Sequence, residues 1–120
     1  MTTQLSPTQF AAWRDGALPS TSTTLPVVLD VREPWELQTA SVKPDGFTLL
    51  HITMRDIPAR ISELQQTLGT THPIACLCHH GMRSLQVANF LKQGGFTEVV
   101  NLQGGIDAWS QFLDPSITRY

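Results

Sequence analysis

Short apolar runs alternate with helical stripes along this chain, and this alternation restricts the folds open to it. The runs at 27–31, 47–52, 73–78 and 98–102 are short and mostly apolar, as expected of strands buried on both faces. Segments with helical spacing of apolar residues lie between them. Strands joined by helices pair in parallel through right-handed crossovers. We therefore predict an α/β fold with a parallel sheet that is covered on both faces.

Capping and helix-breaking residues set the limits of the predicted helices. Ser6 suits an N-cap, because Pro7 follows at the first helical position and Gln9 completes a capping box. Pro34 is tolerated in the first turn of a helix that begins near Glu33. Further helices are expected at 57–68, at 84–93 and after Gly104-Gly105.

Length and composition are typical of one small soluble domain. A chain of 120 residues with 41% hydrophobic content forms one core, so we expect one domain at 1–120, with its core at about 5–113 and a short tail at 114–120. The net charge of −2 and the scattered basic residues predict neither nucleic-acid nor membrane-surface partners. Without a visible secretory signal or spanning segment, and with only two cysteines, a reducing cytoplasmic location is expected.

The chemistry is concentrated in residues 78–83, Cys-His-His-Gly-Met-Arg, here called the Cys78 loop. A cysteine between a strand and a helix lies beside unpaired backbone N–H groups and the positive end of the helix dipole, which favour the thiolate. Arg83 adds a positive charge, so we expect the Cys78 pKa to fall from about 8.5 to about 3.5–7.5. Gly81 lets the amides curl inward around an anion. The alternative is a buried structural cysteine before an ordinary turn.

Three segments, at 29–36, 78–84 and 101–109, resemble in this order the signature segments of single-domain rhodaneses. The resemblance implies a single rhodanese-like α/β domain, with a central parallel sheet of about five strands and helices on both faces. It also implies that Cys78 is an active-site cysteine that carries sulfane sulfur as a persulfide.

The activity implied by this resemblance is that of a thiosulfate sulfurtransferase. The Cys78 thiolate attacks the outer sulfur of thiosulfate, sulfite leaves, and the sulfur passes to cyanide in vitro or to a thiol or protein in vivo. Arg83 orients the anionic donor, since a guanidinium binds two oxygens at once. No metal and no organic cofactor is expected. The expected substrate-binding residues are His79, His80, Gly81, Met82, Arg83 and Ser84.

Residues outside the Cys78 loop have supporting roles in this hypothesis. Asp30 ends a strand and is expected to pair with Arg32, which supports the active-site side of the sheet. Trp35 either walls the pocket or packs in the core. Met82 either forms an apolar lip or packs beneath the loop. Cys76 is expected to be a small buried strand residue.

Three alternatives remain open at this point. The domain can be a module that binds or senses sulfur without turnover. A cysteine-dependent phosphatase or arsenate reductase needs a longer loop to wrap a tetrahedral anion, whereas four residues separate Cys78 from Arg83. A metal site at 76–80 is disfavoured, because four ligands so close in sequence can hardly surround one ion.

Overall fold

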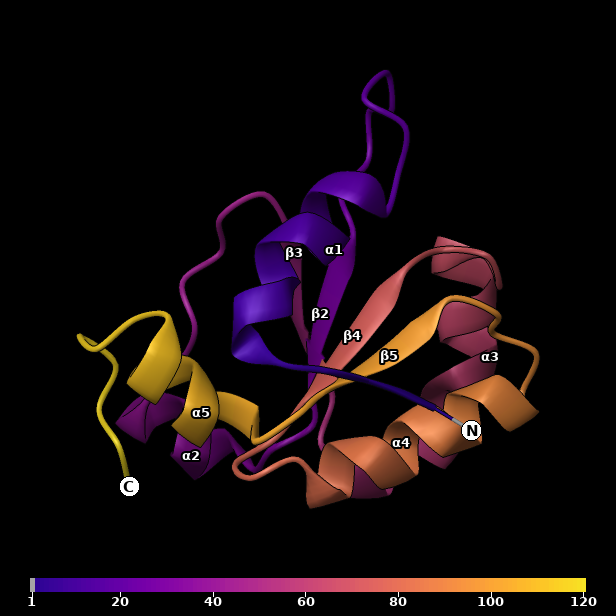
Figure 1. Ribbon diagram of the computed structural model, residues 1–120. Helices are drawn as coiled ribbons and strands as arrows, with labels where there is room; N and C mark the ends of the chain where they lie inside the picture. The colour runs from indigo at the N-terminus through magenta and orange to yellow at the C-terminus, as the bar shows by residue number, and fades with distance from the viewer. Residues whose placement is uncertain (1) are drawn as a thin grey trace.

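The computed structural model describes residues 2–120 and shows a five-stranded parallel sheet with helices on both faces (Figure 1). The strand order is β1-β5-β4-β2-β3. The strands are β1 (Thr3–Leu5), β2 (Val27–Asp30), β3 (Thr48–His51), β4 (Ile74–Leu77) and β5 (Val99–Leu102). The helices are α1 (Phe10–Gly16), α2 (Pro34–Thr39), α3 (Ile57–Leu68), α4 (Met82–Gln93) and α5 (Gly105–Phe112), with short 3₁₀ helices η1 (Pro7–Gln9) and η2 (Met54–Asp56). The predicted α/β fold is confirmed.

Consecutive residues of the central strands pack on opposite faces of the sheet. Val27 and Leu29 of β2 belong to a core that also contains buried residues of α3 and α4. Val28, between them, belongs to a second core formed with residues of α1 and α5. Every residue of β2 and β4 is buried, which explains why these strands read as continuous apolar runs rather than alternating ones.

The helix limits follow the predicted capping signals with two differences. The Gln9 side chain accepts a hydrogen bond from the Ser6 N–H at 2.9 Å, but the first turn is the 3₁₀ helix η1 rather than α-helix. Helix α3 has the predicted limits. Helix α4 begins at Met82, two residues before the prediction, because Gly81 serves as its N-cap with φ +100°. Strand β1 was not predicted, since three edge residues carry no pattern.

Strand β2 ends in a buried ion pair. Arg32 Nη2 lies 2.8 Å from Asp30 Oδ2, and both side chains are 0% exposed. Arg32 also donates to the carbonyl oxygens of Glu36 and Ala40, at 3.3 and 2.9 Å. Burial alone would lower the pKa of Arg32, but the hydrogen bonds that Arg32 donates to Asp30, the charge of Asp30 and the contact with Tyr120 together outweigh burial and raise it. The pair therefore ties the end of β2 to helix α2.

The segment after α5 folds back against that helix. Ile117 is buried, and its carbonyl oxygen accepts a hydrogen bond from the Ser110 hydroxyl at 2.6 Å. Arg119 forms an ion pair with Asp107 at 2.9 Å. Figure 1 shows the C-terminus beside α2 and α5, at the end of the sheet where the strands finish. Residues 114–120, which the sequence marks only as a tail, thus have fixed contacts with the fold.

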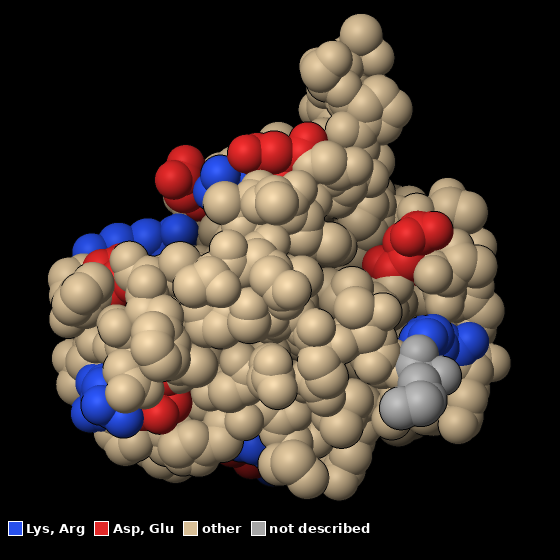
Figure 2. Space-filling view, viewed as in Figure 1, with Lys and Arg blue, Asp and Glu red and all other residues tan. Residues whose placement is uncertain are grey.

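The surface offers few charges on the face seen in Figure 2, where acidic and basic side chains lie mainly around the edges. Within residues 2–120, no helix has both the length and the apolar character needed to cross a bilayer.

We predict that Arg32→Met strongly destabilises the protein, because it leaves the Asp30 carboxylate buried without its partner. The expected loss is about 3–5 kcal/mol in the free energy of unfolding, measured with urea at pH 7. Arg60→Met is the matched control. Arg60 pairs with Glu63 at the surface, so its replacement is expected to change the free energy of unfolding little. Equal stabilities for the two variants would contradict a structural role of the buried pair.

Candidate active site

The Cys78 loop lies where the direction of the sheet connections changes. β2 has β3 on one side and β4 on the other, and β4 continues to β5 on its far side. The connection that follows β2 leads to β3 at one edge of the sheet, whereas the connection that follows β4 leads toward β5 on the other side. Connections that diverge in this way open a crevice beyond the carboxyl ends of the two strands. Cys78 follows β4 directly, so the loop begins at this crevice.

The Cys78 sulfur receives two hydrogen bonds from its own loop and helix. The Gly81 N–H donates to Sγ at 3.1 Å, and the Ser84 hydroxyl donates to it at 3.3 Å. Ser84 lies in the first turn of α4, where backbone N–H groups have no partners within the helix. The Cys78 residue is 1% exposed. Sγ is thus enclosed by groups that favour negative charge.

Helix α5 fixes the loop from its other side. The N–H groups of Ile106 and Asp107 donate to the carbonyl oxygens of Cys78 and His79, at 2.8 and 3.1 Å. A Cβ at Gly105 would lie 2.4 Å from both oxygens, so a side chain cannot be accommodated there. In a trans peptide the N–H points opposite to the C=O. The amides after these carbonyls therefore turn away from α5.

Asn101 of β5 holds the middle of the loop. Its Nδ2 donates to the Gly81 carbonyl oxygen at 3.1 Å, and its side chain is buried. Gly81 has φ +100°, a region that favours glycine, and a Cβ there would lie 3.1 Å from the Gly104 nitrogen. Sequence reasoning assigned no role to Asn101, although an amide inside an apolar strand run is a signal that it needs a specific partner.

Arg83 forms a two-pronged ion pair with Glu36 of α2. Arg83 Nη1 and Nη2 donate to Glu36 Oε2 and Oε1, at 2.7 and 2.9 Å. Hydrogen bonds from Arg83 lower the pKa of Glu36 to about 2, and the same bonds raise the pKa of Arg83. The Glu36 side chain is 4% exposed and that of Arg83 is 35% exposed. Sequence reasoning predicted Arg83 as a donor-binding residue but did not predict this carboxylate beside it.

The two histidines of the loop stack together. The His79 ring lies 3.9 Å from that of His80 and 3.8 Å from that of Tyr120, measured between centroids. Burial, helped by the charge of His80, lowers the pKa of His79. His80 is exposed.

Two large apolar side chains near the loop lie on the surface. Met82 is 69% exposed, so it does not pack beneath the loop. Trp35 is 60% exposed, so the alternative of core packing is wrong for this residue. Its ring meets the Tyr120 ring edge to face at 6.2 Å. Trp35 therefore flanks the tail residue that covers His79.

Cys76 lies apart from this chemistry. It is fully buried in β4, and burial raises the pKa of its thiol well above the ordinary value. Both cysteines are free thiols. Among residues 2–120, no three His, Cys, Asp or Glu side chains are grouped in a way that could hold a metal ion.

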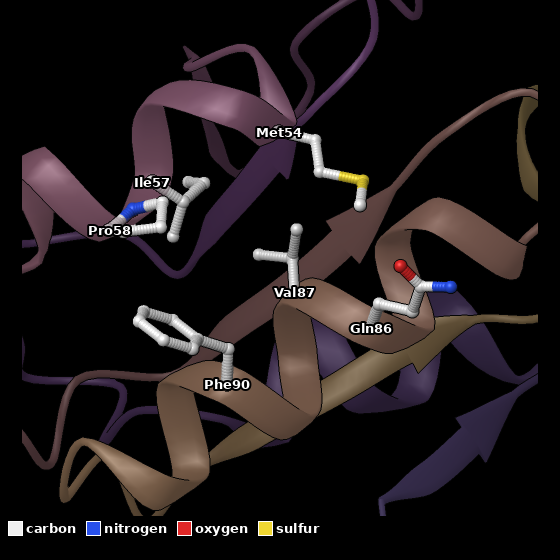
Figure 3. Close-up of a pocket in the computed structure, with 6 residues that line it drawn as sticks. All are labelled: Met54, Ile57, Pro58, Gln86, Val87 and Phe90. Atoms are coloured by element: carbon white, nitrogen blue, oxygen red, sulfur yellow. The ribbon is translucent and has the colours of Figure 1, made fainter.

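A surface pocket of about 450 Å³ opens beside Arg83. Its lining combines Arg83 and the ion pair of Arg55 with Glu33 with apolar side chains that include Val31 and Met54. Met54 also lines a smaller apolar pocket between the η2–α3 segment and α4, where it faces Val87 (Figure 3). The larger pocket therefore places charged groups of both signs and apolar surface beside Arg83.

Comparison with known proteins identifies the fold and the family of this chain. A crystal structure of a rhodanese-related protein from Thermoplasma volcanium matches with a TM-score of 0.72 at 24% identity, over 98% of this chain and 99% of that one, so the two share a fold. Rhodanese-like/PpiC domain-containing protein 12 of Arabidopsis thaliana is 39% identical over 93 residues, which are 78% of this chain but 30% of that protein. The chain thus spans less than a third of this relative.

A relative of similar size is matched over most of its length. A protein of Allochromatium vinosum that is named sulfurtransferase is 34% identical over 85 residues, which cover 71% of this chain and 72% of that protein. The family model described as a rhodanese-like domain matches residues 16–112. The resemblance seen in the sequence is therefore confirmed, and this chain belongs to the rhodanese-like domain family.

Proposed function

We propose that this chain is a sulfurtransferase that carries sulfane sulfur on Cys78. The observation that supports this most is the pair of donors, the Gly81 N–H and the Ser84 hydroxyl, that point at Cys78 Sγ. A structural cysteine shares the burial of Cys78 but needs no such donors. The thiolate is the nucleophilic form of cysteine, and hydrogen bonds to its sulfur favour that form.

Transfer proceeds in two displacements on sulfur. The Cys78 thiolate attacks the outer sulfur of thiosulfate, the S–S bond of the donor breaks, and sulfite leaves with its electron pair. The Cys78 persulfide anion remains, and its outer sulfur accepts hydrogen bonds from the loop amides that α5 turns inward. A nucleophilic acceptor, cyanide in vitro or a thiol or protein in vivo, then takes that sulfur and regenerates the thiolate.

In this proposal Arg83 orients the anionic donor, and Glu36 holds the Arg83 guanidinium in place. A guanidinium has five N–H donors, and Glu36 engages two of them. The remaining donors of Arg83 are available on the side of the pocket that it lines with Arg55. In this proposal Glu36 fixes the guanidinium plane, and the free edge of Arg83 binds the sulfonate oxygens.

The short loop favours sulfur over phosphate as the transferred group. Four residues lie between Cys78 and Arg83, and the loop encloses Sγ almost completely. A single additional sulfur needs less room than a tetrahedral phosphoryl group. The name of the Allochromatium vinosum relative, sulfurtransferase, supports the same reading. A module that binds sulfur without turnover would keep the fold but would not release sulfite.

We predict that thiosulfate treatment adds one sulfur atom to the wild-type protein and to Cys76→Ser, but none to Cys78→Ser. Cys78 has donors at its sulfur, whereas the Cys76 thiol is fully buried and held in its neutral form. Intact mass after removal of excess thiosulfate measures the gain. A gain that persists in Cys78→Ser would contradict the assignment, and no gain in any sample would exclude thiosulfate as the donor.

We also predict that Glu36→Gln slows sulfur loading by thiosulfate about tenfold, because Arg83 loses the carboxylate that orients it. The measurement is the single-turnover rate of sulfite release. Glu63→Gln, which removes the carboxylate of the surface pair with Arg60, is the control and should load sulfur at the wild-type rate. Equal rates in all three proteins would show that Arg83 needs no partner.

The same variant tests the electrostatics of the site. The lowered Glu36 pKa, about 2, contributes stability that is fully present above about pH 4.5 and is lost as pH falls toward 2. Glu36→Gln should therefore cost about 1–3 kcal/mol of unfolding free energy at pH 7, a range reduced for the partial exposure of Arg83. The cost should shrink by pH 3, measured with urea. A cost that is independent of pH would rule out the ion pair as its source.

A further inference from the structure

The hydroxyl of Tyr120 connects the two ion pairs of the carboxyl edge. It accepts a hydrogen bond from Arg32 Nη1 at 2.9 Å and donates to Glu36 Oε1 at 2.9 Å. Arg32 belongs to the buried pair with Asp30, and Glu36 belongs to the pair with Arg83. A residue of the C-terminal segment thus joins the structural end of β2 to the arginine of the Cys78 loop.

Two groups besides Arg83 fix the Glu36 carboxylate. The Glu33 N–H donates to Oε2 at 2.8 Å, and the Tyr120 hydroxyl donates to Oε1. Within residues 2–120, the only other group that donates a hydrogen bond to Oε1 is Arg83 Nη2. Loss of the Tyr120 hydroxyl would therefore leave one carboxylate oxygen held by Arg83 alone, and the plane of the ion pair would be less well defined.

The ring of Tyr120 contacts the loop itself. It stacks on the His79 ring with an interplanar angle of 7°, and the guanidinium of Arg32 lies 5.8 Å from its centroid. His79 is the residue after Cys78, and its carbonyl is already held by α5. The stacked ring therefore restrains the His79 side chain, which has no hydrogen bond with α5 among the described residues.

The rest of the segment holds Tyr120 against this position. Ile117 is buried in the core that contains α5 residues, and its carbonyl oxygen accepts a hydrogen bond from the Ser110 hydroxyl of that helix. The ion pair of Arg119 with Asp107 is more than half exposed on its arginine side and contributes little to this placement. The helix that turns the loop carbonyls outward is therefore also the support for the segment that places Tyr120. The two restraints on the loop share one rigid element.

We propose that Tyr120 is a positioning residue for sulfur transfer: its hydroxyl fixes Glu36 and hence Arg83, and its ring fixes His79 and hence the Cys78 loop. This inference rests on the proposed function, because it assigns Tyr120 a role in loading sulfur onto Cys78. Tyr120 does not touch the reacting atoms and acts through Glu36 and His79.

Three variants separate the parts of this role. Tyr120→Phe removes the hydroxyl and keeps the ring, Tyr120→Ala removes both, and Arg119→Ala disturbs the same segment without either contact. We expect thiosulfate loading to slow about tenfold in Tyr120→Phe and further in Tyr120→Ala, with Arg119→Ala within about twofold of wild type. Tyr120→Phe should remain fully folded at the assay temperature, checked by its thermal unfolding curve, so that slower loading reports positioning rather than unfolding.

The titration of His79, followed by NMR, is a readout that does not need a sulfur donor. Burial and His80 lower the His79 pKa, while the Tyr120 backbone, Glu36 and Asp107 oppose this shift. Removing the stacked ring exposes His79, so its pKa should rise in Tyr120→Ala and stay unchanged in Tyr120→Phe.

Wild-type loading rates in both Tyr120 variants would overturn the inference, as would equal slowing in Arg119→Ala and Tyr120→Ala. If the wild-type protein took up no sulfur, that result would contradict the proposed function rather than the role of Tyr120. The His79 titration would then decide on Tyr120 separately: an unchanged His79 pKa in Tyr120→Ala would show that the ring does not hold the loop.

Discussion

An alternating series of charged and polar groups organises the carboxyl edge of this fold. It runs from Asp30 through Arg32, the Tyr120 hydroxyl and Glu36 to Arg83. Charges removed from water are stable only when each finds an opposite partner with good geometry. Because each member binds the next, the series connects the end of β2, helix α2, the C-terminal segment and the start of α4. The last member of the series lies in the Cys78 loop.

In the proposed function, the groups that stabilise the transferred sulfur are mainly backbone amides. Helix α5 and Asn101 bind carbonyl oxygens of the Cys78 loop, and the Gly81 N–H donates to the sulfur. Only glycine suits position 105, because a Cβ would meet two of those carbonyls. Preorganised amides of this kind stabilise an anion without rearrangement, and this is the property that a persulfide carrier needs.

The sequence predicted the parts of the structure that local pattern determines. The fully buried runs of β2 and β4 and the stripe of α3 were visible because burial and periodicity are properties of neighbouring residues. Strand β1 was missed because it is a strand only through its pairing with β5, which lies far along the chain. Glu36 and Tyr120 were missed for the same reason. Glu36 lies 47 residues before its partner Arg83, and 84 residues before its partner Tyr120. An acid in the first turn of a helix and an aromatic residue in a tail have ordinary local explanations.

If the Cys78 loop holds a sulfur atom on Cys78, a crystal structure of the thiosulfate-treated protein will show it. We expect one additional sulfur about 2.05 Å from Cys78 Sγ, surrounded by the amides of the loop. An unmodified Cys78, or an added sulfur that points away from those amides, would contradict this expectation.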